Sequence, residues 1–122
     1  MIKTIVKRDG RIADFNIDKI ANAIFMAAKA NGGSDYEEAH SIAEMVVDYI
    51  ENKEHIETPH VEHVQDVVEK MLIETGHART AKGYILYRAN RTRVREMDTR
   101  LMKTMENLTF QSAKENDVKR EN

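Results

Sequence analysis

The sequence predicts an α+β fold that is mostly helical, with a short N-terminal β-hairpin followed by four helices. Two observations predict it. The dipeptide Asp9-Gly10 stands between two short runs of strand-forming residues, which is typical of a hairpin turn. The rest of the chain repeats apolar residues at helical spacing, in segments separated by glycine or proline.

The composition points to one domain without thiol chemistry. The 122 residues suffice for a single hydrophobic core. The formal net charge is -2, so any anion site must be local. The absence of cysteine excludes thiol catalysis and structural thiolate metal sites. No apolar run approaches the roughly 18 residues of a membrane span, and no signal-peptide core is present. We therefore expect a cytoplasmic domain with no membrane partner.

Residues 2–15 are expected to form the hairpin, with a type I′ turn in which Asp9 and Gly10 both adopt positive φ. Lys7 and Arg8 stand directly before this dipeptide. Two cations so close in the chain repel each other, and a surface hairpin needs only solubility. An anionic ligand at the turn would explain why both are present.

The first two helices are indicated by caps and apolar stripes. Asn16 is the expected N-cap of the first helix, which ends at Asn31-Gly32-Gly33. Ser34 has capping-box spacing with Glu37 at the start of the second helix. Each stripe predicts one buried helix face.

The last two helices follow a brief extended segment at residues 55–57. Thr58 is the expected N-cap of the third helix, with Pro59 at its first position, and Gly76 ends it. The fourth helix is expected from residue 78 to beyond residue 101, with a crowded basic face. A polar tail begins near residue 107.

The hairpin and the helix starts together indicate a cleft that could bind an anion. The helix after Asn16 offers free N–H groups and a positive dipole there, with Lys19 one turn in. Thr58 opens another helix, and its hydroxyl could cap that helix or contact a ligand. The alternative is that Asn16 and Thr58 are ordinary caps and that Lys7 and Arg8 are solvated turn charges.

The histidines, the carboxylates of the third helix and the arginines of the fourth give weaker indications of a functional site. His60 and His63 lie three apart on one helix, but no recognisable ligand spacing completes a metal site, so we expect surface histidines. Glu62, Asp66 and Glu69 lack a matched nucleophile and fit a solvated helix face. The arginines of the fourth helix could bind nucleic acid phosphates. They could equally balance the acidic second and third helices, which is the simpler interpretation.

Two stretches of the sequence resemble the ATP-cone domain, the nucleotide-sensing module found mainly in ribonucleotide reductases. They are VKRDGRIADFNIDKI near the N-terminus and VQDVVEKMLIETGHARTAKGYILYRANR later in the chain. The resemblance covers residues 4–95. It implies a four-helix bundle capped by a small three-stranded β-sheet, whose third strand is the segment near Ile56. The cone would occupy residues 1–106, and a polar linker would occupy residues 107–122.

The C-terminal stretch LMKTMENLTF resembles the passage from the cone into the glycyl-radical barrel of anaerobic, class III ribonucleoside-triphosphate reductases. The implied parent is such an oxidoreductase, and its catalytic domain is an implied partner. The chain has no cysteine to carry a thiyl radical. We therefore expect no enzyme activity from the chain alone.

The resemblance also implies a set of binding residues. Lys7 and Arg8 would contact the triphosphate, and the backbone around Ile5 and Val6 would line the base. The other members lie at two helix starts and on the phosphate side of the fourth helix: Asn16 and Lys19, Thr58 and Glu62, and Arg88 and Arg91.

The function implied by the resemblance is allosteric control of deoxyribonucleotide synthesis. ATP would keep the reductase active and dATP would switch it off, each bound with Mg²⁺ in one cleft. Nucleotide would also control homo-oligomer formation, and no specific nucleic acid partner is expected. The alternative is a non-catalytic helical protein- or nucleic-acid-interaction module that has lost nucleotide binding. Salt-sensitive DNA binding without an ATP response would indicate it.

Overall fold

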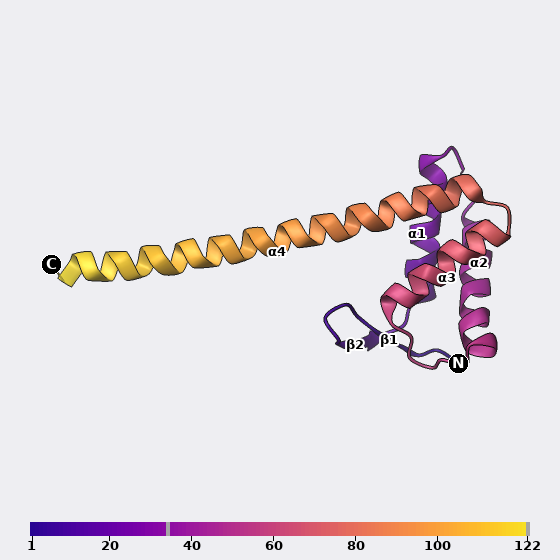
Figure 1. Cartoon of the computed structure of the whole chain (residues 1–122), viewed down its shortest axis with the longest axis horizontal. Helices are drawn as coiled ribbons and strands as arrows, with labels where there is room; N and C mark the ends of the chain where they lie inside the picture. Colours follow the sequence, from indigo (N-terminus) through magenta and orange to yellow (C-terminus); the bar gives the residue numbers. More distant parts are fainter. Residues whose placement is uncertain (34, 122) are drawn as a thin grey trace. The chain divides into compact units, whose positions relative to one another are not determined.

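The computed structural model shows a short β-hairpin followed by helices (Figure 1). It describes residues 1–33 and 35–121, and the side chains of these residues up to 107. The elements are β1 (Thr4–Val6), β2 (Ile12–Asp14), α1 (Ile17–Ala30), α2 (Tyr36–Asp48), the π-helical turn η1 (Tyr49–Lys53), α3 (Val61–Glu74) and α4 (Ala78–Glu121). The chain divides into two units, Met1–Tyr87 and Arg88–Asn122. The predicted fold class, mostly helical α+β, is confirmed.

The sheet has two antiparallel strands, in which Thr4 pairs with Asp14 and Val6 with Ile12. The predicted third strand near Ile56 does not form in the part of the chain that the structure describes. An isolated parallel bridge between Val6 and His60 takes its place, where Val6 N donates to Pro59 O at 2.9 Å. Two residues explain the difference. His55 has a φ of 56°, which interrupts an extended chain, and Pro59 has no N–H to donate to a ladder.

The hairpin turn differs from the predicted type I′ turn. Lys7 N donates to Arg11 O at 2.8 Å, and Gly10 N donates to Lys7 O at 2.9 Å. Within the described turn only Gly10 has a positive φ, 87°. The loop therefore has three residues and ends in one left-handed glycine, which is the usual alternative to the two-residue turn. Asp9 thereby avoids the left-handed region, which costs energy for a residue with a Cβ.

Two of the predicted helix caps are tested by the structure. Asn16 caps α1 as predicted, because its side chain accepts from Asp18 N at 2.9 Å. The prediction that Thr58 caps α3 is wrong: the N-cap is His60, whose Nδ1 accepts from Glu62 N at 3.1 Å. The bridge to β1 involves His60, whose backbone is extended, so the helix begins only at Val61.

The start of α2 falls one residue later than the capping-box pattern places it. The cap is Asp35, whose side chain accepts from Glu38 N at 3.1 Å. Ser34, the predicted cap, lies outside the described residues.

The core of the first unit lies where α1 packs on α2 and α2 packs on α3. Ala81 and Tyr84 from the start of α4 join it. The largest fully buried side chains of the three complete helices and η1 are Ile24, Val46, Ile50, Val68 and Leu72. Within this unit the predicted four-helix bundle is therefore reduced to α1, α2, α3 and residues 78–87 of α4. The exposed, charged residues that follow in α4 explain why the core ends there.

The first turns of α4 approach the C-terminal end of α1 closely at Gly83. A methyl group on Gly83 would lie 2.6 Å from Asn31 Nδ2 and 3.1 Å from Ala27 O. Asn31 Nδ2 already donates to Ala27 O at 3.0 Å and to Arg79 O at 3.2 Å, so it is held in place. Glycine is therefore required here by packing, even though it is a poor helix former.

We expect Gly83→Ala to lower the free energy of unfolding by about 1–2 kcal/mol, because overpacking outweighs the gain in helix propensity. Denaturant unfolding measures it. The exposed neighbour Lys82→Ala is the matched control and should change stability little. Asn31→Ala in the Gly83→Ala background should recover part of the loss, because it removes the nearer contact. A Gly83→Ala chain that is more stable than wild type would show that the close approach is absent.

Candidate functional site

The hairpin turn holds two cations without acidic partners. Lys7 is exposed and Arg8 is half-buried. Arg8 Nε is fully buried and has no hydrogen-bond partner among the described residues. Neither residue forms an ion pair within the described part of the chain. A buried donor without an acceptor is costly, and a phosphate is an acceptor that a guanidinium suits well.

The one carboxylate in the turn is occupied by the third cation. Arg11 donates to Asp9 twice, from its backbone N to Oδ1 at 3.0 Å and from Nε to Oδ2 at 2.6 Å. The Arg11 backbone N–H, followed by its side chain, holds the pKa of Asp9 below its usual value. Asp9 therefore stays ionised and paired with Arg11, and its charge is not directed at Lys7 or Arg8.

The opposite end of β1 contacts the segment that leads into α3. Thr4 Oγ1 and Thr58 Oγ1 share a hydrogen bond of 2.9 Å. The bridge between Val6 and His60 then brings the start of α3, and with it Glu62, beside the last residue of β1. Thr58 is thus joined to the hairpin by its hydroxyl instead of capping a helix.

Asn16 and Lys19 lie at the end of the hairpin away from the turn. Because Asp14 pairs with Thr4, the chain has already passed the start of β1 when it reaches Asn16. Asn16 Oδ1 is engaged by the cap of α1, and Lys19 is exposed in the first turn of that helix. From Thr4 to Lys7 the strand covers about 10 Å. The predicted binding residues of the first unit therefore line the hairpin from one end to the other.

The remaining predicted binding residues belong to the second unit. Arg88 and Arg91 lie three residues apart on α4; the first is half-buried and the second is exposed. Their predicted place on the phosphate side stays a prediction.

One polar group in the helices was not found from the sequence. Gln65 Oε1 on α3 is buried and has no hydrogen-bond partner in the part of the chain that the structure describes. A signal was present, because Gln65 stands one turn before Val68 and two turns before Leu72, which are both buried. A polar residue in an apolar helical stripe marks an unusual position.

The histidines are mostly engaged with carboxylates. His63 Nε2 lies 2.7 Å from Glu54 Oε1, and His40 Nδ1 lies 3.0 Å from Glu44 Oε1. His77 contacts Glu38 in the same way. Among the described residues no group of three or more histidine, aspartate or glutamate side chains could hold a metal ion.

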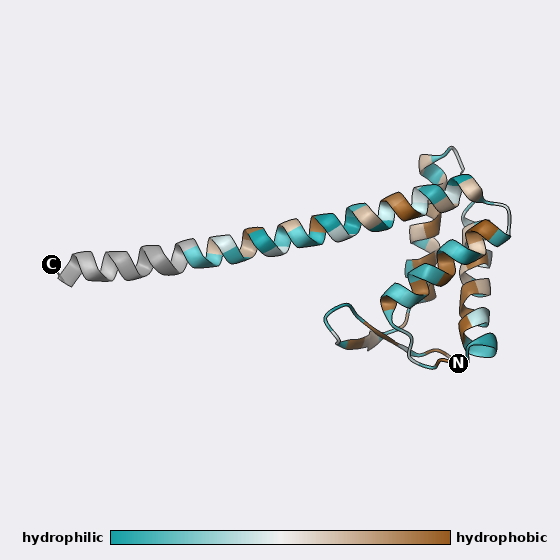
Figure 2. Cartoon of the chain, in the orientation of Figure 1, coloured by the Kyte–Doolittle hydropathy of each residue, from teal (hydrophilic) through white to brown (hydrophobic). Residues whose placement is uncertain are grey.

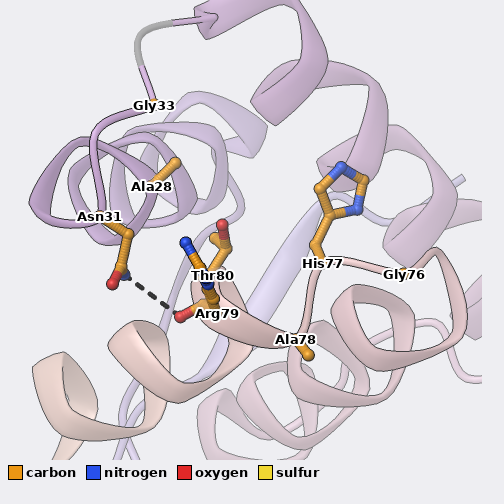
Figure 3. Close-up of a pocket in the computed structure, with 8 residues that line it drawn as sticks. All are labelled: Ala28, Asn31, Gly33, Gly76, His77, Ala78, Arg79 and Thr80. Atoms are coloured by element: carbon orange, nitrogen blue, oxygen red, sulfur yellow. Dashed lines mark hydrogen bonds between the residues drawn. The ribbon is translucent and has the colours of Figure 1, made fainter.

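A separate pocket of about 470 Å³ lies where the C-terminal end of α1 meets the loop before α4 (Figure 3). Its polar lining comes from Asn31, His77, Arg79 and Thr80. Figure 3 shows the hydrogen bond from Asn31 to the Arg79 carbonyl at its edge. None of the predicted binding residues lines this pocket.

In the described part of the chain no helix is long and apolar enough to cross a membrane.

Most of the chain matches the model of a known family. The model of the ATP cone domain matches residues 3–93. The chain belongs to the ATP cone domain family. The resemblance noted in the motifs around Lys7 and Tyr84 is thereby confirmed.

Several proteins similar to this chain are ribonucleotide reductases. A vitamin B12-dependent ribonucleoside-diphosphate reductase of Thermoplasma acidophilum is 41% identical over 101 residues, which cover 79% of this chain and 13% of that protein. An anaerobic ribonucleoside-triphosphate reductase of Haemophilus influenzae is 36% identical, over 88% of this chain and 15% of that protein. A ribonucleoside-diphosphate reductase subunit alpha of Chlamydia muridarum is 33% identical, over 76% and 10%. The chain thus spans no more than 15% of the length of these relatives.

Proposed function

We propose that this ATP cone binds adenine nucleotides at its hairpin and thereby regulates a ribonucleotide reductase. The observation that carries the proposal is the buried, unpartnered Arg8 Nε beside Lys7, with the neighbouring carboxylate of Asp9 already paired with Arg11. The turn therefore has two cations ready for an anionic ligand. The family and the reductase relatives support the choice of a nucleotide as that ligand.

The proposed ligand lies along β1, with its Mg²⁺-bound triphosphate at Lys7 and Arg8. The base and ribose would then extend past Ile5 and Val6. Val6 N already donates to Pro59 O at 2.9 Å, so its N–H is not available to the base. Contact with the base would come from the Ile5 and Val6 side chains or from other backbone groups of β1. The remaining proposed contacts are Asn16, Lys19, Thr58 and Glu62, with Arg88 and Arg91 on the phosphate side.

The proposed regulation distinguishes ATP from dATP by the ribose 2′-hydroxyl. A buried partner that loses this hydroxyl would lose about 1–3 kcal/mol, which matches the usual size of an allosteric coupling free energy. ATP would activate and dATP would inhibit. Because some of the similar proteins are anaerobic ribonucleoside-triphosphate reductases, we propose that class for the parent enzyme. The chain itself would be its regulatory part, since it has no cysteine for the radical chemistry.

Titration calorimetry with ATP and dATP in the presence of Mg²⁺ tests the proposal. Each nucleotide should bind saturably, and prior saturation with one should abolish the heat of the other. Two independent binding heats would contradict a single shared cleft. If neither nucleotide binds, and DNA binds in a salt-sensitive way, the interaction-module alternative is correct instead.

A further inference from the structure

The second unit carries an apolar stripe that is exposed in the part of the unit whose side chains the structure describes. It consists of Val94, Met97, Leu101 and Met105, here called the α4 stripe, whose members are between 44% and 59% exposed. Their spacing of three, four and four residues puts them on one helix face. Figure 2 shows hydrophobic positions recurring among hydrophilic ones along the described part of α4. Such a stripe on an otherwise charged helix is typical of a surface that binds a partner.

Opposite charges flank the α4 stripe on its two sides. In heptad terms Val94 and Leu101 occupy a positions and Met97 a d position. Asp98 is then an e residue, while Arg93 is a g residue. In two-stranded coiled coils, e and g residues face each other across the seam and determine how the helices pair.

The positions of these charges favour one arrangement of two identical helices. With two α4 helices parallel and in register, Arg93 faces Asp98 of the second copy, and the pair occurs twice by symmetry. Arg100 then lies beside Met105 of the second copy, against which its aliphatic stem can pack. No pair of like charges faces each other along the α4 stripe.

An antiparallel arrangement centred on the α4 stripe would instead bring like charges together. It brings Asp98 against Asp98 of the second copy, and it brings Arg93 close to Arg100. Like charges in contact across an interface are strongly unfavourable.

In the present structure Arg93 Nη2 donates to Asn90 Oδ1 of its own helix at 3.1 Å, so the guanidinium is held beside the edge of the α4 stripe. Asp98 forms no ion pair within the described residues.

We propose that the α4 stripe is the docking surface for a second copy of this chain, with the two α4 helices parallel and in register. This association does not depend on nucleotide. Polar Asn90 and Thr104 occupy the other d positions of the seam, which weakens a two-stranded coiled coil. The dimer is therefore reversible and depends on protein concentration.

Cysteine cross-linking of the whole chain, without nucleotide, tests the arrangement. The chain contains no cysteine, so a single introduced thiol is unique. Thr104→Cys places it at a d position, facing its own counterpart in a parallel dimer, and mild oxidation should give a covalent dimer. Thr99→Cys is the matched control on the opposite side of the helix and should give no covalent dimer. Equal cross-linking of the two variants, or none at Thr104, would overturn the proposal.

Sedimentation equilibrium of charge variants tests the pairing itself. Asp98→Arg should weaken the dimer about tenfold or more, because it faces Arg93 of the second copy. Adding Arg93→Asp to Asp98→Arg should restore association, since the charges are exchanged. The outer-face variant Arg95→Asp is the control and should dimerise like wild type.

Leu101→Asp should leave a monomer, and the melting temperature of each variant checks that the first unit stays folded. Wild-type chain that is monomeric at every concentration, or a charge-exchanged variant that stays dissociated, would refute the parallel pairing.

Discussion

ATP and dATP should each raise the melting temperature of the chain by close to 10 °C, whereas GTP and CTP should raise it much less. Ligand at about a hundred times its dissociation constant adds roughly 2.7 kcal/mol to the free energy of unfolding. For a domain of this length each kcal/mol moves the midpoint by about 4 °C or more. The selectivity follows from the proposed site, because only an adenine nucleotide would use both the cations of the turn and the base-binding part of β1. A dye-based melt with each nucleotide measures it.

Mg²⁺ belongs in every sample of that melt, because an unscreened triphosphate would be repelled by Glu62 near the hairpin. The double variant Asp9→Asn, Arg11→Ala is a useful companion, since it removes this ion pair as a whole and both residues lie outside the proposed contacts. It should keep the shifts. Four equal shifts would identify a generic anion site, and the absence of any shift would contradict nucleotide binding.

Local signals in the sequence predicted most of the helical part of the fold. The cap at Asn16 and the stripe of α1 depend on residues close in the chain, and both are present in the structure. The start of α3 was missed because it depends on a distant contact. Thr58 and Pro59 form a good local helix start, but the bond from Val6 N to Pro59 O keeps that segment extended. Pairing of this segment with β1 is thus favoured over a helix cap at Thr58.

The hairpin turn at the candidate site could likewise be predicted from the sequence only in part. The closeness of Lys7 and Arg8 in sequence indicated an anion, and both remain without carboxylate partners in the described structure. Their unequal burial could not be predicted, because it depends on a three-residue loop instead of the expected two-residue turn. The pairing of Asp9 with Arg11 could likewise not be predicted, since three cations lie within two residues of Asp9 in the sequence.

Arg8→Ala should weaken ATP binding about tenfold to a hundredfold while leaving adenosine binding nearly unchanged. A hydrogen bond between charged groups contributes roughly 1.5–3 kcal/mol, and the buried Arg8 Nε has no other acceptor in the described structure. Lys7→Ala should have a smaller effect in the same direction, because its exposed ammonium is already solvated. Calorimetric titration of each variant with ATP and with adenosine provides both affinities.

The comparison between the two ligands distinguishes phosphate binding from a structural role of the turn. If Arg8 only supported the hairpin, its removal would displace β1 and weaken ATP and adenosine binding equally. The double variant Asp9→Asn, Arg11→Ala removes a cation from the same turn without freeing the Asp9 carboxylate, and it should leave ATP affinity within about twofold, since exposed ion pairs contribute little. A double variant that lost as much affinity as the Arg8 variant would mean that binding depends on the conformation of the whole turn. The buried Nε of Arg8 would then have no special role in binding the triphosphate.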